Sequence, residues 1–170
     1  CTFYPVFVAA AGSNQTPSVR TAATAFSLDA ANNVLTVTAT TARYADLAES
    51  YASDKKYEPG TVMVFGGIAE ITISTQAIDP SVAGVVSTEP AHLMNAFQIG
   101  EHILNIALVG RVPCKVVGTI RKGDILVTSR VPGVAIAGGA DIKVGTVVGK
   151  ALADYNSDHI GTIEVAVGRT

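Results

Sequence analysis

Two acidic residues, Asp46 and Glu49, stand three positions apart in the segment 42–53. The apolar residues of this segment recur at positions i, i+3, i+4 and i+7, which predicts a short amphipathic helix whose stripe consists of Tyr44, Leu47, Ala48 and Tyr51. On a helix, side chains three residues apart lie on the same side. The two carboxylates are therefore candidate catalytic residues, one acting as base or nucleophile while the other holds a proton.

A simpler interpretation of Asp46 and Glu49 is an exposed helix face, paired with Arg43 or with a neighbouring chain. Helical carboxylates are common on protein surfaces, and surface ion pairs contribute little to stability. The pattern leaves three roles open for the pair: an exposed face, a contact between chains, or the remnant of a catalytic site.

The other potentially reactive residues do not stand at the spacing of a metal site or a phosphate-binding loop. The three histidines, His92, His102 and His159, do not stand at metal-ligand spacing, although His92 and His102 could meet across a three-fold axis. No glycine pair is followed by the Lys-Ser/Thr and helix that a phosphate-binding loop needs. Cys114 is expected to be a small buried residue within a strand. We therefore expect no metal and no cofactor.

The composition argues against nucleic-acid binding and against insertion into a membrane. Of 170 residues, 48% are apolar and only 15% are charged, with a net charge of −2. Nucleic-acid binding requires clustered Lys and Arg, and spanning a bilayer requires about 20 consecutive apolar residues. Neither feature occurs, so the apolar excess is expected to be buried against other copies of the chain. The absence of an initiator Met suggests a C-terminal piece of a longer polypeptide or a processed product.

The chain divides into three expected parts. Residues 1–41 are rich in Ala, Thr, Ser and Asn, and their few strands are expected to pair between chains as a fibre stem. Residues 42–56 are the expected connecting helix and linker. Residues 57–170 contain many short strands separated by glycine turns, which predicts a compact all-β barrel or sandwich.

The expected strands have definite bounds. In the first part they are Phe3–Val8, Phe26–Asp29 and Val34–Thr38, the last two forming a hairpin. In the last part they are Val62–Phe65, Ala69–Ser74, Val82–Val86, Ile106–Val109, Val112–Val117, Ile125–Thr128, Val134–Ala137, Thr146–Val148 and Ile163–Val167. Residues 121–124 predict a tight hairpin turn between two of these strands, and Glu89–Phe97 has room for one helical turn.

A series of short sequence words runs in order through residues 42–169. The words are Ala45-Asp46-Leu47-Ala48-Glu49, Pro59-Gly60-Thr61-Val62, Val82-Ala83-Gly84-Val85-Val86-Ser87-Thr88-Glu89-Pro90, Leu93-Met94-Asn95, Ala107-Leu108-Val109-Gly110-Arg111-Val112-Pro113, Lys122-Gly123-Asp124-Ile125-Leu126-Val127-Thr128-Ser129 and Gly149-Lys150-Ala151-Leu152. Together they resemble the intramolecular-chaperone domain of the self-cleaving tail-fibre and appendage proteins of tailed phages, the G2 peptidase type. Residues 1–41 resemble the fibre stem that precedes such domains.

The resemblance implies a β-rich, homotrimeric structural domain at the end of a phage tail fibre or appendage, located on the virion. Such a domain helps three chains find register before the stem assembles. In the self-cleaving relatives the cut lies just before an acidic residue, which here implies cleavage at Ala45–Asp46. The chain departs from that pattern, because Ala45 has no hydroxyl with which to attack its own carbonyl.

A third possible function is a tip that binds a host-cell receptor or a glycan. An exposed cluster of Tyr44, Tyr51, Tyr57 or Tyr155 would favour this function, because sugars stack on exposed aromatic rings. Aromatic residues make up only 6% of the chain and Trp is absent, which argues against it.

Overall fold

The computed structural model of the chain contains two compact units, residues 1–42 and residues 43–170. It describes residues 46–140 and 142–168 in full, and of the residues before Asp46 it describes the backbone of five short strands. The expected contacts between stem chains lie outside this single-chain structure.

The first unit contains short antiparallel strands. β4 pairs with β5 in the register Phe26↔Val37 to Asp29↔Val34, and β1 pairs with the other edge of β4. β2 pairs with β3 separately. The bounds are Thr2–Phe3 (β1), Val6–Phe7 (β2), Ser18–Val19 (β3), Phe26–Asp29 (β4) and Val34–Val37 (β5).

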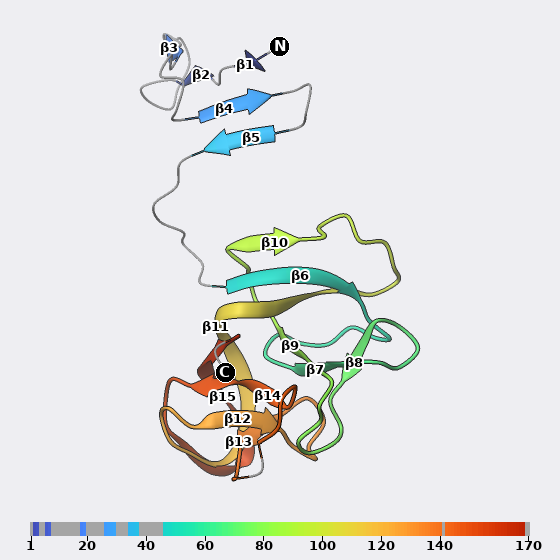
Figure 1. The fold of residues 1–170 in the computed structure, drawn as a ribbon, viewed down its shortest axis with the longest axis vertical. Helices are drawn as coiled ribbons and strands as arrows, with labels where there is room; N and C mark the ends of the chain where they lie inside the picture. Colours follow the sequence, from blue (N-terminus) through green and yellow to red (C-terminus); the bar gives the residue numbers. More distant parts are fainter. Residues whose placement is uncertain are drawn as a thin grey trace. The chain divides into compact units, whose positions relative to one another are not determined.

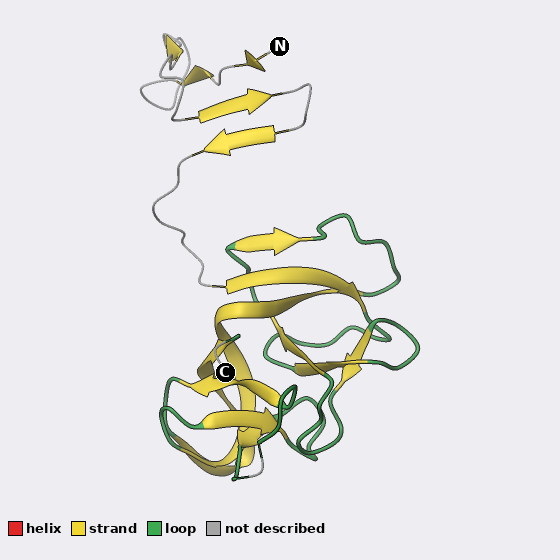
Figure 2. Cartoon of the chain, viewed as in Figure 1, coloured by secondary structure: helices red, strands yellow, loops and turns green. Residues whose placement is uncertain are grey.

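The second unit is built from strands, and the residues described contain no helix (Figure 2). The predicted all-β class is therefore confirmed. The bounds are Asp46–Ala52 (β6), Val62–Phe65 (β7), Ile71–Ile73 (β8), Val82–Val86 (β9), His92–Met94 (β10), Ile103–Ile120 (β11), Ile125–Thr128 (β12), Ala135–Ala137 (β13), Val147–Ala151 (β14) and Tyr155–Val167 (β15).

Five of these strands close into a barrel, in the order β11-β15-β14-β12-β13. Antiparallel pairs join successive strands, and the parallel pair Val116↔Ala135 joins β13 back to β11. A tight turn forms at residues 121–124 between β11 and β12, with the amide of Asp124 donating to the carbonyl of Arg121 at 3.0 Å. The predicted hairpin is wrong, because β12 pairs with β13 and β14 rather than with β11.

The 18-residue strand β11 extends beyond the barrel and carries the remaining strands (Figure 1). Its first half pairs with β6 and with β9, and β9 continues through β7 to β8. Two separate strands were predicted here, at Ile106–Val109 and Val112–Val117. A single strand forms because its neighbours change along its length: β6 pairs as far as Gly110, and β13 pairs at Val116.

Pro113 lies where β11 changes partners. Amides two residues apart in a strand point to the same edge, and the amide of Lys115 donates to the carbonyl of Gly60 on the edge away from β15. The nitrogen of Pro113 therefore faces that edge, between the end of the β6 pairing and Gly60. A proline here removes no hydrogen bond from the β11–β15 ladder.

The helix predicted over residues 42–53 is wrong for its described part, which is the strand β6. Buried residues alternate with half-buried ones along β6, and Ala48 and Tyr51 lie on opposite faces. A helix this short is marginal by itself, and strand pairing on both edges decides the conformation. β11 pairs antiparallel with one edge, and β10 pairs parallel with the other.

The helical turn considered for Glu89–Phe97 is also absent. Its centre is the strand β10, which pairs with Leu47–Glu49 of β6. The amide of Ala91 donates to the backbone carbonyl of Asp46 at 2.8 Å, so this segment continues the sheet.

Two apolar cores support the unit. The barrel interior is filled by apolar side chains from its strands and from β7 and β9, including Val116, Leu126 and Val165. A second cluster lies outside the barrel and contains Met63, Ile71, Ala83, Val86, Leu104 and Ile106. A register shift between Ala107 and Val109 accompanies two consecutive buried residues, Ile106 and Ala107, which belong to different cores.

Gly84 in β9 lies so close to β11 that the structure leaves no room for a side chain there. Its φ is +146°, and a Cβ there would lie 2.5 Å from the carbonyl oxygen of Ala107 and 2.7 Å from Cγ2 of Ile106. We expect Gly84→Ala to lower the free energy of unfolding by roughly 1–3 kcal/mol, measured by urea denaturation. Gly139→Ala is the control, because nothing lies within 4 Å of its Cβ position. Equal stability of the two variants would contradict this packing.

Candidate functional site

The strand β6 separates the two predicted catalytic residues. Asp46, Ala48 and Ser50 are buried on one face, whereas Leu47, Glu49 and Tyr51 lie on the other face and are half-buried. Side chains alternate along a strand, so residues three apart point to opposite faces. The prediction that Asp46 and Glu49 share one side is therefore wrong, because it depended on the helix.

The side chain of Asp46 is buried next to Ser87, which directly follows the strand β9. The Asp46 side chain is 5% exposed, and its Oδ2 accepts a hydrogen bond of 2.6 Å from Oγ of Ser87. The backbone of Ser87 is fixed as well, since its amide donates to the carbonyl of Asn105 in β11 at 2.8 Å. Asp46 thus joins the start of β6 to the end of β9 by a charge-assisted hydrogen bond.

Glu49 has a different partner, Tyr51 on the same face of β6. The Tyr51 hydroxyl donates to Oε2 of Glu49 at 2.7 Å, and the Tyr51 ring meets the Phe65 ring edge-on at a centroid distance of 5.6 Å. Burial raises the pKa of the Tyr51 hydroxyl from 10.0 to about 12, with further contributions from the hydrogen bond and charge of Glu49 and from the charge of Glu70. The phenol therefore stays protonated at neutral pH and remains a donor.

This arrangement does not assemble an Asp46–Glu49 acid–base pair. Each carboxylate accepts a hydroxyl hydrogen bond on its own side of the strand. Ser87 was missed as the partner of Asp46 because the two residues are 41 positions apart, although both belong to the sequence words that resemble the phage domain. The geometry favours a structural role for Asp46 at the beginning of the compact unit.

The described histidines and the described cysteine show no reactive arrangement. Within residues 46–140 and 142–168, no group of three His, Cys, Asp or Glu side chains is placed to hold a metal ion. His102 lies 3.8 Å from the carboxylate of the neighbouring Glu101. Cys114 is fully buried, as predicted, and burial raises the pKa of its thiol to about 12 despite the nearby charge of Lys115. A thiol so protonated is a poor nucleophile.

The tyrosines named as a possible sugar platform are only partly accessible. Tyr51, Tyr57 and Tyr155 are half-buried, and Tyr44 lies outside the described residues. Each of the three described hydroxyls donates within the chain, to Glu49, to Asp54 and to the carbonyl of His159 respectively. Burial also raises the pKa of Tyr57, helped by its hydrogen bond to Asp54. The described tyrosines therefore form no open aromatic surface.

Comparison with known proteins assigns this chain to no family. No protein-family model matches this sequence, and no curated protein matches it either. In the part of the chain that the structure describes, no helix has the length and hydropathy of a membrane span.

The Ser87–Asp46 hydrogen bond provides a direct test of the structural role. Ser87→Ala leaves a buried carboxylate without its hydroxyl donor, so we expect a loss of about 1.5–3 kcal/mol in unfolding free energy. Tyr51→Phe is the matched control, because it removes a hydroxyl from a carboxylate that is more accessible, and we expect a smaller loss. Chemical denaturation monitored by circular dichroism gives both values. A loss for Ser87→Ala that is no larger than the loss for Tyr51→Phe would contradict this structural role.

Proposed function

We propose that this chain is a structural virion component: the C-terminal trimerisation domain of a tailed-phage tail fibre or appendage, with the end of the stem attached. Its role is to bring three chains into register and to form the fibre end. The ordered sequence words described above support the phage assignment, and the low charge of the chain supports assembly with copies of itself.

The observation that carries the proposal is a set of three almost fully exposed apolar side chains on two loops that a hydrogen bond joins. Phe97 and Ile99 are 96% and 92% exposed in the loop between β10 and β11, and Ile68 is 95% exposed in the turn between β7 and β8. We call these three residues the apolar loop cluster. Burial of such side chains contributes about 1.5–3 kcal/mol each, which favours association.

Polar contacts hold the two loops of the cluster together. The Gln98 side-chain amide donates to Oε2 of Glu70 at 2.9 Å, and the same oxygen accepts from the amide of Ala52 at 2.8 Å. The loops are therefore tied to each other and to the end of β6. Fixed apolar loops lose less conformational entropy on association than loops without such ties.

A compact domain that trimerises also accounts for the stem-like first unit. Short strands gain little stability by themselves. Joining three chains at one end raises the local concentration of the other ends, so that the stem strands meet as intramolecular partners. In this proposal residues 1–41 pair between chains after the compact units have associated.

Substitution of the cluster tests its role in assembly. We expect the wild-type chain to elute as a trimer and the double variant Phe97→Ser/Ile99→Ser to dissociate to monomers, measured by size-exclusion chromatography with light scattering. Val144→Ser is the control, because Val144 is 100% exposed but lies in the segment before β14. A double variant that remains trimeric would remove the cluster from the interface.

Self-cleavage at Ala45–Asp46 is the competing function, and the Ser87 hydroxyl at the Asp46 carboxylate is the observation in its favour. We expect no cleavage, since Glu49 lies on the other face of β6 and does not form an acid–base pair with Asp46. Intact-mass spectrometry of freshly purified protein, followed over several days, is the measurement. A fragment beginning at Asp46 that disappears in Glu49→Ala or Ser87→Ala would establish the peptidase instead.

A further inference from the structure

Three cationic residues line a hollow on the outer side of the barrel. The hollow has a volume of about 470 Å³, and Arg111, Lys122 and Lys150 line it together with small or apolar residues: Gly110, Gly123, Ala151, Leu152 and Ala166. The three cations come from different elements, namely β11, the turn after β11, and β14. We propose that this hollow binds a phosphate group, either as free phosphate or as part of a phosphorylated sugar.

Strand register places two of the cations on either side of a small residue. Arg111 in β11 and Lys150 in β14 are both paired directly with Ala166 in β15. Directly paired residues point to the same face, and adjacent strands lie about 4.8 Å apart. The guanidinium and the ammonium therefore extend from positions about 10 Å apart, with only a methyl group between them. This leaves room for a compact anion above Ala166.

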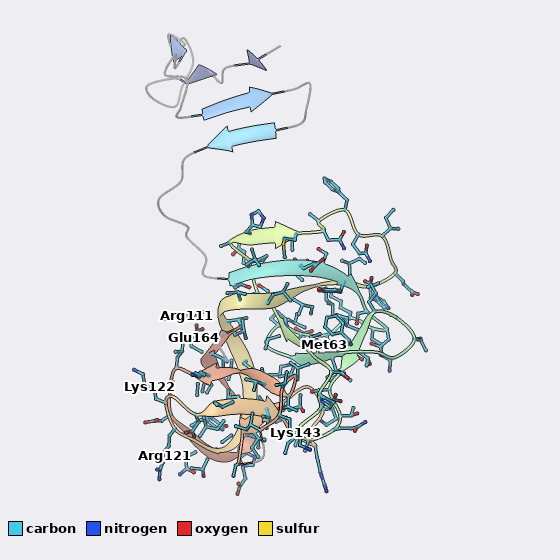
Figure 3. The ribbon with its side chains drawn as sticks, in the orientation of Figure 1. Met63, Arg111, Arg121, Lys122, Lys143 and Glu164 are labelled. Atoms are coloured by element: carbon cyan, nitrogen blue, oxygen red, sulfur yellow. The ribbon has the colours of Figure 1, made fainter. Side chains whose placement is uncertain are left out.

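The third cation comes from the tight turn. Lys122 precedes Gly123, whose φ of +95° suits glycine, and the Lys122 amide donates to Oδ1 of Asp154 at 2.7 Å. This bond fixes the backbone of the turn at the margin of the hollow. In Figure 3, Lys122 and Arg111 both lie along the left side of the barrel, whereas Lys143 lies at the lower right.

The three cations have no acidic partner within salt-bridge distance. Among the described residues the single ion pair within 4.0 Å is His102–Glu101. Glu164 shares the face of Ala166, two residues away on β15, but it lies beyond that distance from the cations. The Asp154 carboxylate accepts from the Lys122 amide at the margin of the hollow but forms no ion pair with the three cations. The three like charges repel one another, and a bound anion relieves that repulsion.

The number of cations favours phosphate over a carboxylate. A planar carboxylate is satisfied by one guanidinium through two parallel hydrogen bonds. A phosphate carries up to two charges near neutral pH and has oxygens pointing in several directions, so it can meet an arginine fork and two ammonium groups together. The site lies within one chain, so it does not depend on the proposed trimer.

Calorimetric titration of the full chain with inorganic phosphate at low ionic strength tests the site. We expect Arg111→Gln and Lys150→Gln each to weaken binding about tenfold, since each removes a charge-assisted hydrogen bond. Glu164→Gln should tighten binding, because it removes a carboxylate that lies two residues from Ala166 on the same face of β15. Lys143→Gln is the matched control and should leave binding unchanged.

Glucose 6-phosphate and glucose in parallel titrations distinguish the sources of the phosphate group. Tighter binding of glucose 6-phosphate than of inorganic phosphate indicates a sugar phosphate, and equal binding indicates free phosphate as sufficient. The proposal is overturned if phosphate does not bind, if Lys143→Gln weakens binding as much as Arg111→Gln, or if glucose binds as well as its phosphate.

Discussion

The pairing of β11 is the constraint on which the rest of the compact unit depends. This strand of 18 residues forms one wall of the closed barrel and continues beyond it to carry β6 and β9. Its residues contribute to both apolar cores, with Val116 in the barrel and Ile106 in the outer cluster. A change in its register would alter both cores at once, since a shift of one residue moves every side chain to the other face.

The same register assigns chemical roles to the residues beside β11. Asp46 is paired with Gly110, and its side chain is buried against Ser87 rather than available to a substrate. Arg111, one position further, points to the opposite face, where Ala166 and Lys150 continue the row. Positions 110 and 111 of β11 thus lie beside different features: Gly110 pairs with the residue of the internal hydrogen bond, and Arg111 belongs to the external cationic surface.

The sequence predicted most of the strands of the compact unit. Val62–Phe65, Val82–Val86 and Ile125–Thr128 form with the predicted bounds, because glycine or polar turns flank short apolar runs. The helix predicted around Asp46 was wrong for a definite reason. The spacing of Leu, Ala and Tyr in this segment is typical of an amphipathic helix, but pairing with β10 and β11 outweighs that preference.

The candidate sites were harder to predict because they depend on residues far apart in the chain. Ser87 reaches Asp46 only through the pairing of β9 and β6 with β11. Likewise Arg111, Lys122 and Lys150 show no motif, and their proximity follows from barrel closure. Burial of Cys114 was predictable, since a Cys in an apolar strand is usually a core residue.

Trimerisation is the central claim, and the number of chains in the native particle tests it most directly. Native mass spectrometry of the unmodified chain at micromolar concentration measures that number without assumptions about shape. Three copies per particle, persisting on dilution, are the expected result. A particle with the mass of a single chain would contradict the proposed role in a fibre.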